Sequence, residues 1–190
     1  MKGRDVARYY YFCASLPLLQ FESEPPFSET QFLVLAAQHL TPEDRAVLLA
    51  ALDEREETDH PLVLRIREWM KGVHNNLALL RGQRLGVNGL SWTRGMVDGY
   101  YAERVKSVFQ HESPTGKQDA YDRMVWEFLE ECGAGHAFDL ESLIVYALKL
   151  RLLAARAERT EERGSDIFDR VFQHLRTQDI VEKLPFGERQ

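Results

Sequence analysis

Cysteine is scarce in this chain. Cys13 and Cys132 are the only two, they lie far apart in the sequence, and no Cys-x-x-Cys pair exists. We therefore expect neither a disulfide framework nor a structural zinc site built from clustered cysteines. Two isolated cysteines are typical of a reducing compartment, where each thiol acts as a small buried apolar group.

Long apolar runs and an excess of positive charge are also missing. No stretch approaches the about 18 consecutive apolar residues that a membrane helix needs, and the N-terminus lacks a basic region followed by an apolar leader. The formal net charge is −6, which disfavours general binding to nucleic acid. The chain is expected to be cytoplasmic, with no membrane span and no nucleic-acid partner.

Sequence motifs of catalysis and cofactor binding are absent as well. The chain contains no His-Glu-x-x-His and no glycine-rich phosphate-binding motif. One Glu57-x-x-His60 lies in an acidic stretch before Pro61, whereas di-iron helix bundles need two such motifs on facing helices. A solvated loop is the simpler interpretation, and we expect no enzyme activity, no cofactor and no metal site.

The apolar residues that are present recur at helical spacing. Ser28 and Gln31 form a capping box, and Thr41 followed by Pro42 marks a second helix start. The stretch from Tyr121 to Cys132 repeats apolar residues every three or four positions. Helices are predicted over residues 28–40, 41–52, 61–80, 95–109, 121–132, 139–163 and 165–175. The last of these places Ile167, Phe168, Val171, Phe172 and Leu175 on one face.

Breaks between these helices carry turn residues. Residues 82–95 are rich in glycine and are predicted to form a loop or a broken helix. The Ser113-Pro114-Thr115-Gly116 sequence is a turn signal. No alternation of strands and helices is visible, which argues against a parallel α/β sheet. The prediction is one all-α domain over residues 1–190, an irregular assembly of roughly six to eight helices, with a polar, flexible tail over residues 1–8.

The longest of the predicted helices, over residues 139–163, is expected to organise the fold. Asp139 is a good N-cap, leucine and alanine follow it, and Gly164 can end the helix. The first half, residues 140–153, is apolar on nearly every side, which predicts that other helices surround it. The second half is strongly charged and is expected to reach solvent.

The segment over residues 9–19 is ambiguous. Tyr9, Tyr10, Tyr11 and Phe12 favour a strand, but no second strand-like run exists to pair with it. We favour a short helix that ends before Pro17, because proline disfavours helical geometry at the preceding residue.

Charge is segregated along the chain. Residues 22–59 hold ten acidic and two basic residues, whereas residues 60–97 hold six basic residues and one acidic residue. The six basic residues are Arg65, Arg67, Lys71, Arg81, Arg84 and Arg94. Such segregation can steer docking to an oppositely charged partner. Solvated faces that neutralise each other within the fold are the slightly favoured explanation, since charges on helices usually face water.

Two stretches resemble a known group of proteins. Tyr9-Tyr10-Tyr11, continuing through Ala14-Ser15-Leu16-Pro17 to Leu19, and the later stretch from Glu141 to Leu153 resemble an uncharacterised bacterial family encoded among V/A-type ATPase subunits. That family is similar to a shortened form of the ATPase's C-type subunit, whose eukaryotic counterpart is the d-type subunit. The C-type subunit is an all-helical funnel that sits on the cytoplasmic end of the membrane rotor ring and receives the central shaft. It is a good deal longer than this chain, which would hold only part of the funnel.

The resemblance implies a function without catalysis. It implies a subunit or accessory protein of a V/A-type proton- or sodium-translocating ATPase that links the central shaft to the rotor ring. Its partners would be central-stalk and rotor-ring subunits, which would hold it at the inner membrane. Tyr9, Tyr10 and Tyr11 would form a buried anchor for the funnel wall, and the six basic residues would dock partners. The alternatives are an ATPase assembly factor and an unrelated all-α enzyme or small-molecule-binding protein.

Overall fold

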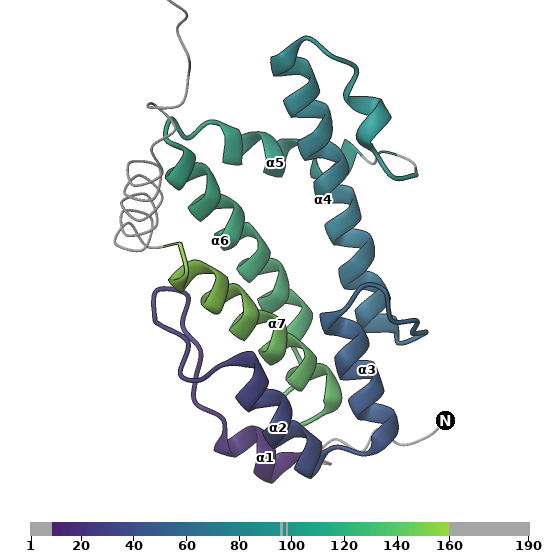
Figure 1. Cartoon of the computed structure of the whole chain (residues 1–190), viewed down its shortest axis with the longest axis vertical. Coiled ribbons are helices and arrows are strands. Elements are labelled where there is room, and N and C mark those ends of the chain that lie inside the picture. The colour runs from purple at the N-terminus through teal and green to yellow at the C-terminus, as the bar shows by residue number, and fades with distance from the viewer. Residues whose placement is uncertain (1–8, 96, 98, 160–190) are drawn as a thin grey trace, which may run out of the picture.

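The computed structural model describes residues 9–95, 97 and 99–159 of the chain. Within this part, the chain forms seven α-helices, two short 3-10 helices and no strand, which confirms the all-α prediction (Figure 1). In chain order the elements are α1 (Tyr10–Ser15), α2 (Glu29–His39), α3 (Pro42–Leu52), α4 (Pro61–Leu85), η1 (Gly89–Trp92), η2 (Gly99–Tyr101), α5 (Ala102–Phe109), α6 (Pro114–Gly133) and α7 (Leu140–Ala157). The predicted tail over residues 1–8 and the predicted helix over residues 165–175 lie outside the described residues.

The predicted N-caps of three helices are confirmed. The Ser28 hydroxyl accepts the N–H of Gln31 at 3.2 Å, and the Gln31 side chain accepts the N–H of Ser28 at 2.9 Å. The Thr41 hydroxyl accepts the N–H of Asp44 at 3.2 Å. Asp139 accepts the N–H of Ser142 at 3.0 Å. Each contact satisfies a first-turn donor that the helix itself leaves free.

The start of α6 differs from the prediction. Ser113 and Pro114, predicted as part of a turn, are the N-cap and the first residue of this helix. The Ser113 hydroxyl accepts the N–H of Gly116 at 2.9 Å. Proline lacks the N–H that a first helical turn leaves unpaired, so a residue that predicts a turn can equally begin a helix.

Glycine-rich residues after α4 are more ordered than predicted. α4 continues to Leu85, η1 follows at Gly89–Trp92, and the helix predicted over residues 95–109 is replaced by η2 and the short α5. Gly86, with φ of +68°, adopts the left-handed conformation that ends α4.

α7 organises the helices around it, as predicted. Leu143, Ile144, Ala147 and Leu150 are at most 1% exposed, and α2, α3 and α6 pack against α7. The prediction is wrong for residues 158 and 159, since α7 ends at Ala157, and the predicted residues 160–163 lie outside the described part of the chain. Arg159 closes the last turn, because its N–H donates to the carbonyl of Arg156 at 3.0 Å and its Nε donates to that of Ala155 at 2.7 Å.

The segment of ambiguous character is a helix. α1 covers Tyr10–Ser15, and Leu16 is its C-cap, so the helix ends before Pro17, as we favoured. It lies beside the start of α7, because the N–H of Tyr9 donates to the carbonyl of Phe138 at 3.1 Å. Tyr146 of α7 donates from its hydroxyl to the carbonyl of Pro17 at 3.0 Å.

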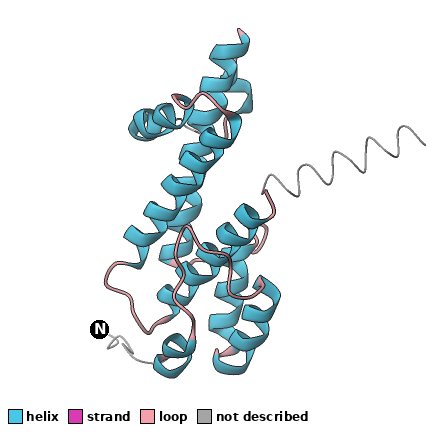
Figure 2. Ribbon diagram, turned by 90° about the vertical axis from the view of Figure 1, so that its left-hand side faces the viewer, coloured by secondary structure: helices cyan, strands magenta, loops and turns pink. Residues whose placement is uncertain are grey.

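α4 passes from the packed helices out to one end of the molecule. Trp69, in its first half, stacks on Phe128 of α6 with ring centroids 4.0 Å apart, and α5 contacts both α4 and α6. The last turns of α4 extend beyond the other helices, at the top of Figure 1 and in the side view of Figure 2. We call residues 72–95 the distal arm, and we call α1, α2, α3, α6, α7 and the first half of α4 the body.

None of the helices in the described part of the chain combines the length and the apolar character that crossing a bilayer requires.

Candidate docking surface

Glycines allow the distal arm to fold back on itself. A Cβ atom added to Gly82 would lie 2.6 Å from the Cα and N atoms of Gly89, and one added to Gly89 would lie 2.8 Å from the carbonyl oxygen of Ala78. Only hydrogen side chains leave room for this approach of η1 to α4. The N–H of Val87 donates to the carbonyl of Gly82 at 3.0 Å and closes the turn.

A buried asparagine fixes the far end of the same segment. Asn75 of α4 is 2% exposed. Its Nδ2 donates to the carbonyl of Arg94 at 3.0 Å, and its Oδ1 accepts the N–H of Arg94 at 2.8 Å. One side chain thus pairs both backbone groups of a residue 19 positions away. The arm is a built structure held by polar contacts and close backbone packing.

Large apolar side chains of the arm face solvent. Leu85 is 72% exposed, Leu90 59%, Trp92 57% and Val87 47%. They come from one short stretch, the end of α4 and the turn into η1. Grouped exposed apolar side chains mark interaction sites more often than isolated ones do, and tryptophan is enriched in interfaces.

Two of the six predicted docking cations are used within the fold. Arg67 donates from Nη2 to the carbonyls of Ala50 at 2.7 Å, Asp53 at 3.0 Å and Glu56 at 2.8 Å. Arg67 therefore fastens the linker between α3 and α4. Lys71 pairs with Glu68 on its own helix at 2.5 Å.

Aromatic rings engage two further cations. The guanidinium of Arg65 lies 5.8 Å from the centroid of Phe128. That of Arg84 lies 4.6 Å from the centroid of Phe109, and its Nη2 donates to the Phe109 carbonyl at 3.1 Å. Both side chains remain exposed, so each retains donors for a partner.

The last two cations, Arg81 and Arg94, are exposed, and their side chains make no hydrogen bond or ion pair with any described residue. Residues 72–95 contain no acidic side chain. The arm therefore presents positive charge beside its exposed apolar residues, a combination that fits an acidic partner with an apolar face.

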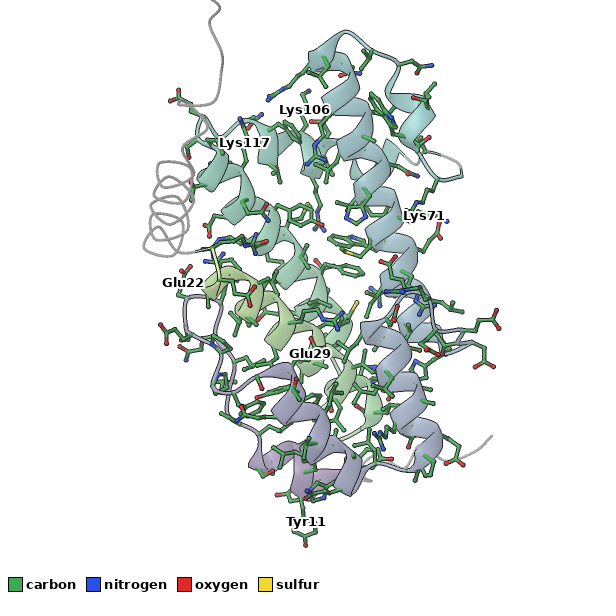
Figure 3. The ribbon with its side chains drawn as sticks, in the orientation of Figure 1. Tyr11, Glu22, Glu29, Lys71, Lys106 and Lys117 are labelled. Carbon is green, nitrogen blue, oxygen red and sulfur yellow. The ribbon has the colours of Figure 1, made fainter. Side chains whose placement is uncertain are left out.

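A cleft of about 520 Å³ opens where the arm meets the α3–α4 linker. Its lining comprises Glu54, Arg67, Lys71, His74, Asn75, Trp92 and Arg94. Figure 3 labels Lys71 on α4. We call this the basic cleft. Three of the predicted cations line it, and Trp92 connects it to the exposed apolar surface.

His74 is the titratable group of the basic cleft. Desolvation is the main influence and lowers its pKa below the ordinary value of 6.5. Glu54 raises the pKa, whereas Arg94 and Arg81 lower it. The Tyr121 hydroxyl lies 3.3 Å from Nε2 of His74. A neutral imidazole is therefore favoured in this positively charged surrounding.

The tyrosine segment lies at the opposite end of the molecule. Tyr9 is 6% exposed, and its hydroxyl donates to the Asp44 carboxylate. Tyr10 packs on Phe138 with centroids 4.6 Å apart but is 47% exposed. Tyr11 is 87% exposed and points away from the body (Figure 3). The predicted burial is found for Tyr9 but not for Tyr10 and Tyr11, because the short α1 can turn only one face inward. The role of these residues as an anchor stays a prediction.

A histidine–carboxylate cluster was not predicted. Ligand atoms of His136, Asp139 and Glu141 lie within 4.8 Å of one another, and Nε2 of His60 lies 4.0 Å from Glu141. Nitrogen and oxygen donors of this kind can bind a divalent cation. However, the Asp139 oxygens already accept from Ser142 and contact His136 at 2.6 Å, and the positive end of the α7 dipole disfavours a cation there. Capping explains this cluster.

Comparisons of the chain with protein-family models, with curated proteins and with solved structures found no match. The candidate surface is therefore identified from its geometry: exposed apolar residues of the distal arm beside two exposed cations that have no partner among the described residues. The sequence predicted the cations but missed the apolar residues. The sequence does carry a signal for this apolar surface. Positions 85–92 hold four large apolar residues that are interrupted by glycine and do not follow a helical period.

Proposed function

We propose that this chain is a non-catalytic subunit or accessory protein of a V/A-type proton- or sodium-translocating ATPase. In this proposal it lies in the cytoplasm, peripheral to the inner membrane, and links central-stalk and rotor-ring subunits through protein contacts. The distal arm is the surface that docks one of these partners. The body supplies the stiffness that a coupling element needs, because close-packed interiors resist deformation.

One observation carries the proposal. The two stretches that resemble the ATPase-associated family, residues 9–19 and 141–153, pack directly on each other. Cys13 Sγ lies 3.6 Å from Ser142 Oγ, and Tyr146 bonds to the carbonyl of Pro17 at 3.0 Å. These contacts join positions 129 residues apart. The resemblance therefore describes one three-dimensional unit of the body and not two unrelated segments.

Affinity purification tests the proposal. The tagged chain is recovered from gently solubilised membranes of its own host, and the co-purifying proteins and their ratios are determined. Recovery of shaft and ring subunits in fixed stoichiometry is expected. Recovery only with incomplete complexes would favour an assembly factor, and recovery of no ATPase component would overturn the proposal.

Variants of the arm sharpen this experiment. Trp92→Ala and Arg94→Glu are expected to reduce recovery, since truncating a central aromatic residue of an interface costs about 2–4 kcal/mol of binding, or roughly 30-fold or more in Kd. Val34→Ala is the matched control, because Val34 is also 57% exposed but lies on α2. Equal losses for Val34→Ala and Trp92→Ala would argue against docking through the arm.

The basic cleft supports a second candidate function, the binding of a small anionic ligand. Its volume of about 520 Å³ lies within the range of ligand sites in proteins, about 300–1,000 Å³. Inorganic phosphate and nucleotides are suitable probes in a thermal-shift titration. Saturable stabilisation that is lost in Arg94→Glu but retained in Arg84→Glu would favour this function, and no stabilisation by any anion would exclude it.

A further inference from the structure

The body contains an apolar groove that adjoins the basic cleft and shares Glu54 and Arg67 with it. Its volume is about 260 Å³. The lining comes from α3, α4, α6 and α7 and is mostly aliphatic and aromatic. We call it the central groove. Carbon side chains dominate it, so water alone is a poor occupant.

Three helices each contribute apolar side chains to the central groove. α7 contributes Leu148, Leu152 and Ala155, spaced four and three residues apart, and all three are half-buried. α6 contributes Tyr121 and Val125, and α4 contributes Ile66 and Met70, again four residues apart. Residues at this spacing share one side of a helix. Three such sides together form a trough that matches another amphipathic helix.

Of the three charged residues that line the central groove, the two arginines already have partners, and Glu54 is exposed to solvent. Nε and Nη2 of Arg151 contact the Glu29 carboxylate at 2.6 and 2.8 Å, and Nη1 donates to the carbonyl of Leu52. Arg67 binds three carbonyls through Nη2. An occupant of the central groove therefore needs apolar side chains more than it needs countercharge.

We propose that the central groove is occupied by this chain's own C-terminal segment, residues 160–190. Five apolar residues of that segment, Ile167, Phe168, Val171, Phe172 and Leu175, share one side of a helix by their spacing. The opposite side would carry Asp166, Arg170 and Gln173. The chain thus follows α7 with a sequence whose apolar face is complementary to the groove that α7 helps to form.

The available length permits this arrangement. Ala155, at one end of the groove, lies four residues before Arg159, the last described position. Residues 160–166, fully extended, span up to roughly 23 Å, whereas the α7 residues from Leu148 to Ala157 rise only about 14 Å. The segment can therefore reverse direction and lie along the groove. An apolar cavity of about 150 Å³ can hold a benzene ring, so the larger central groove accommodates one phenylalanine ring together with an aliphatic side chain.

Photo-crosslinking of the full chain tests the proposal. p-Benzoylphenylalanine replaces Phe168 in one variant and Gln173, on the opposite side of the predicted helix, in the other. After illumination, the crosslinked positions are found by mass spectrometry. The Phe168 variant is expected to form intramolecular crosslinks to Met70, Leu148 or Leu152, at a yield several-fold above that of the Gln173 variant.

A second variant blocks the groove. Ala155→Glu places a carboxylate at its edge on an otherwise intact helix, and it is expected to reduce the crosslinks from position 168 at least fivefold while the circular-dichroism spectrum stays unchanged. Crosslinks from position 168 to other surfaces, equal yields from both probe positions, or crosslinks between two molecules would overturn the proposal. These outcomes are independent of ATPase binding.

Discussion

The body and the distal arm are held together by different kinds of contact. The body buries large side chains completely, among them Phe32, Leu48, Leu143 and Leu150 at 0–1% exposure. The arm is held by the Gly82–Gly89 contact and by the Asn75 clamp, and it leaves Leu85 and Trp92 mostly exposed. Apolar side chains stabilise the body itself, whereas in the arm they remain available to another molecule.

The largest expected contrast between the two regions is in stability. Phe32→Ala removes a fully buried ring from the body and is expected to lower the free energy of unfolding by about 3–5 kcal/mol. Trp92→Ala, at an exposed position, is expected to change it by less than about 0.5 kcal/mol. Urea unfolding followed by circular dichroism measures both. Similar losses would show that Trp92 belongs to the core.

A smaller effect is expected at the glycine contact of the arm. Gly82→Ala places a methyl group 2.6 Å from the backbone of Gly89, and the resulting displacement of η1 is expected to cost about 1–3 kcal/mol. Gly133→Ala is the matched control, since its nearest neighbour would be Val145 Cγ1 at 3.4 Å. If Gly82→Ala and Gly133→Ala both stabilise the protein, the close approach of η1 to α4 at Gly82 does not contribute to its stability.

The asparagine clamp should contribute a similar amount. Asn75→Ala removes two hydrogen bonds to the backbone of Arg94, each worth about 0.5–1.5 kcal/mol, and we expect a total loss near the middle of that combined range. Faster amide exchange confined to residues 87–95 would accompany it. Asn88→Ala, an exposed residue that caps only Leu90, should leave the exchange of Arg94 unchanged.

The smallest expected effect is a pH dependence. Because desolvation lowers the pKa of folded His74, the unfolded chain binds a proton more readily at this site. Above the unfolded pKa of about 6.5, His74 is neutral in both states and the free energy of unfolding is at its full value. As the pH falls toward the lower pKa of folded His74, protonation of the unfolded chain reduces this free energy. His74→Gln should therefore lose less stability than the wild type between pH 7.5 and 5. An identical pH profile would contradict this assignment.

Much of the body could be predicted from the sequence because local chemistry determines it. The caps at Ser28, Thr41 and Asp139 act within three residues, and the apolar period of α6 is visible directly. Ser113-Pro114 was misjudged because the same residues begin turns and helices. The end of α7 depends on carbonyl contacts made by Arg159 that spacing does not reveal.

The candidate site was less predictable because its properties depend on contacts between distant residues. Arg67 and Arg94 both belong to the basic segment of residues 60–97, and the sequence does not distinguish them. In the structure, Arg67 binds carbonyls 11–17 residues away, whereas Arg94 faces solvent. The glycines of residues 82–95 predicted a loop. The contact between Gly82 and Gly89, which makes this segment an ordered turn, is visible only in the folded structure. Exposure of Tyr11 likewise depends on which face α1 turns inward.

The Asn75 clamp and the glycine contact also bear on the order in which the molecule folds. They join residues 19 and seven positions apart, whereas the contacts of residues 9–19 with α7 join residues 129 positions apart. The entropy lost on closing a loop increases with its length, and short-range contacts form sooner. During synthesis or refolding, the arm can therefore form as a local helix and turn before α7 packs into the body. The apolar tip of the arm is then exposed to partners before the rest of the molecule has folded.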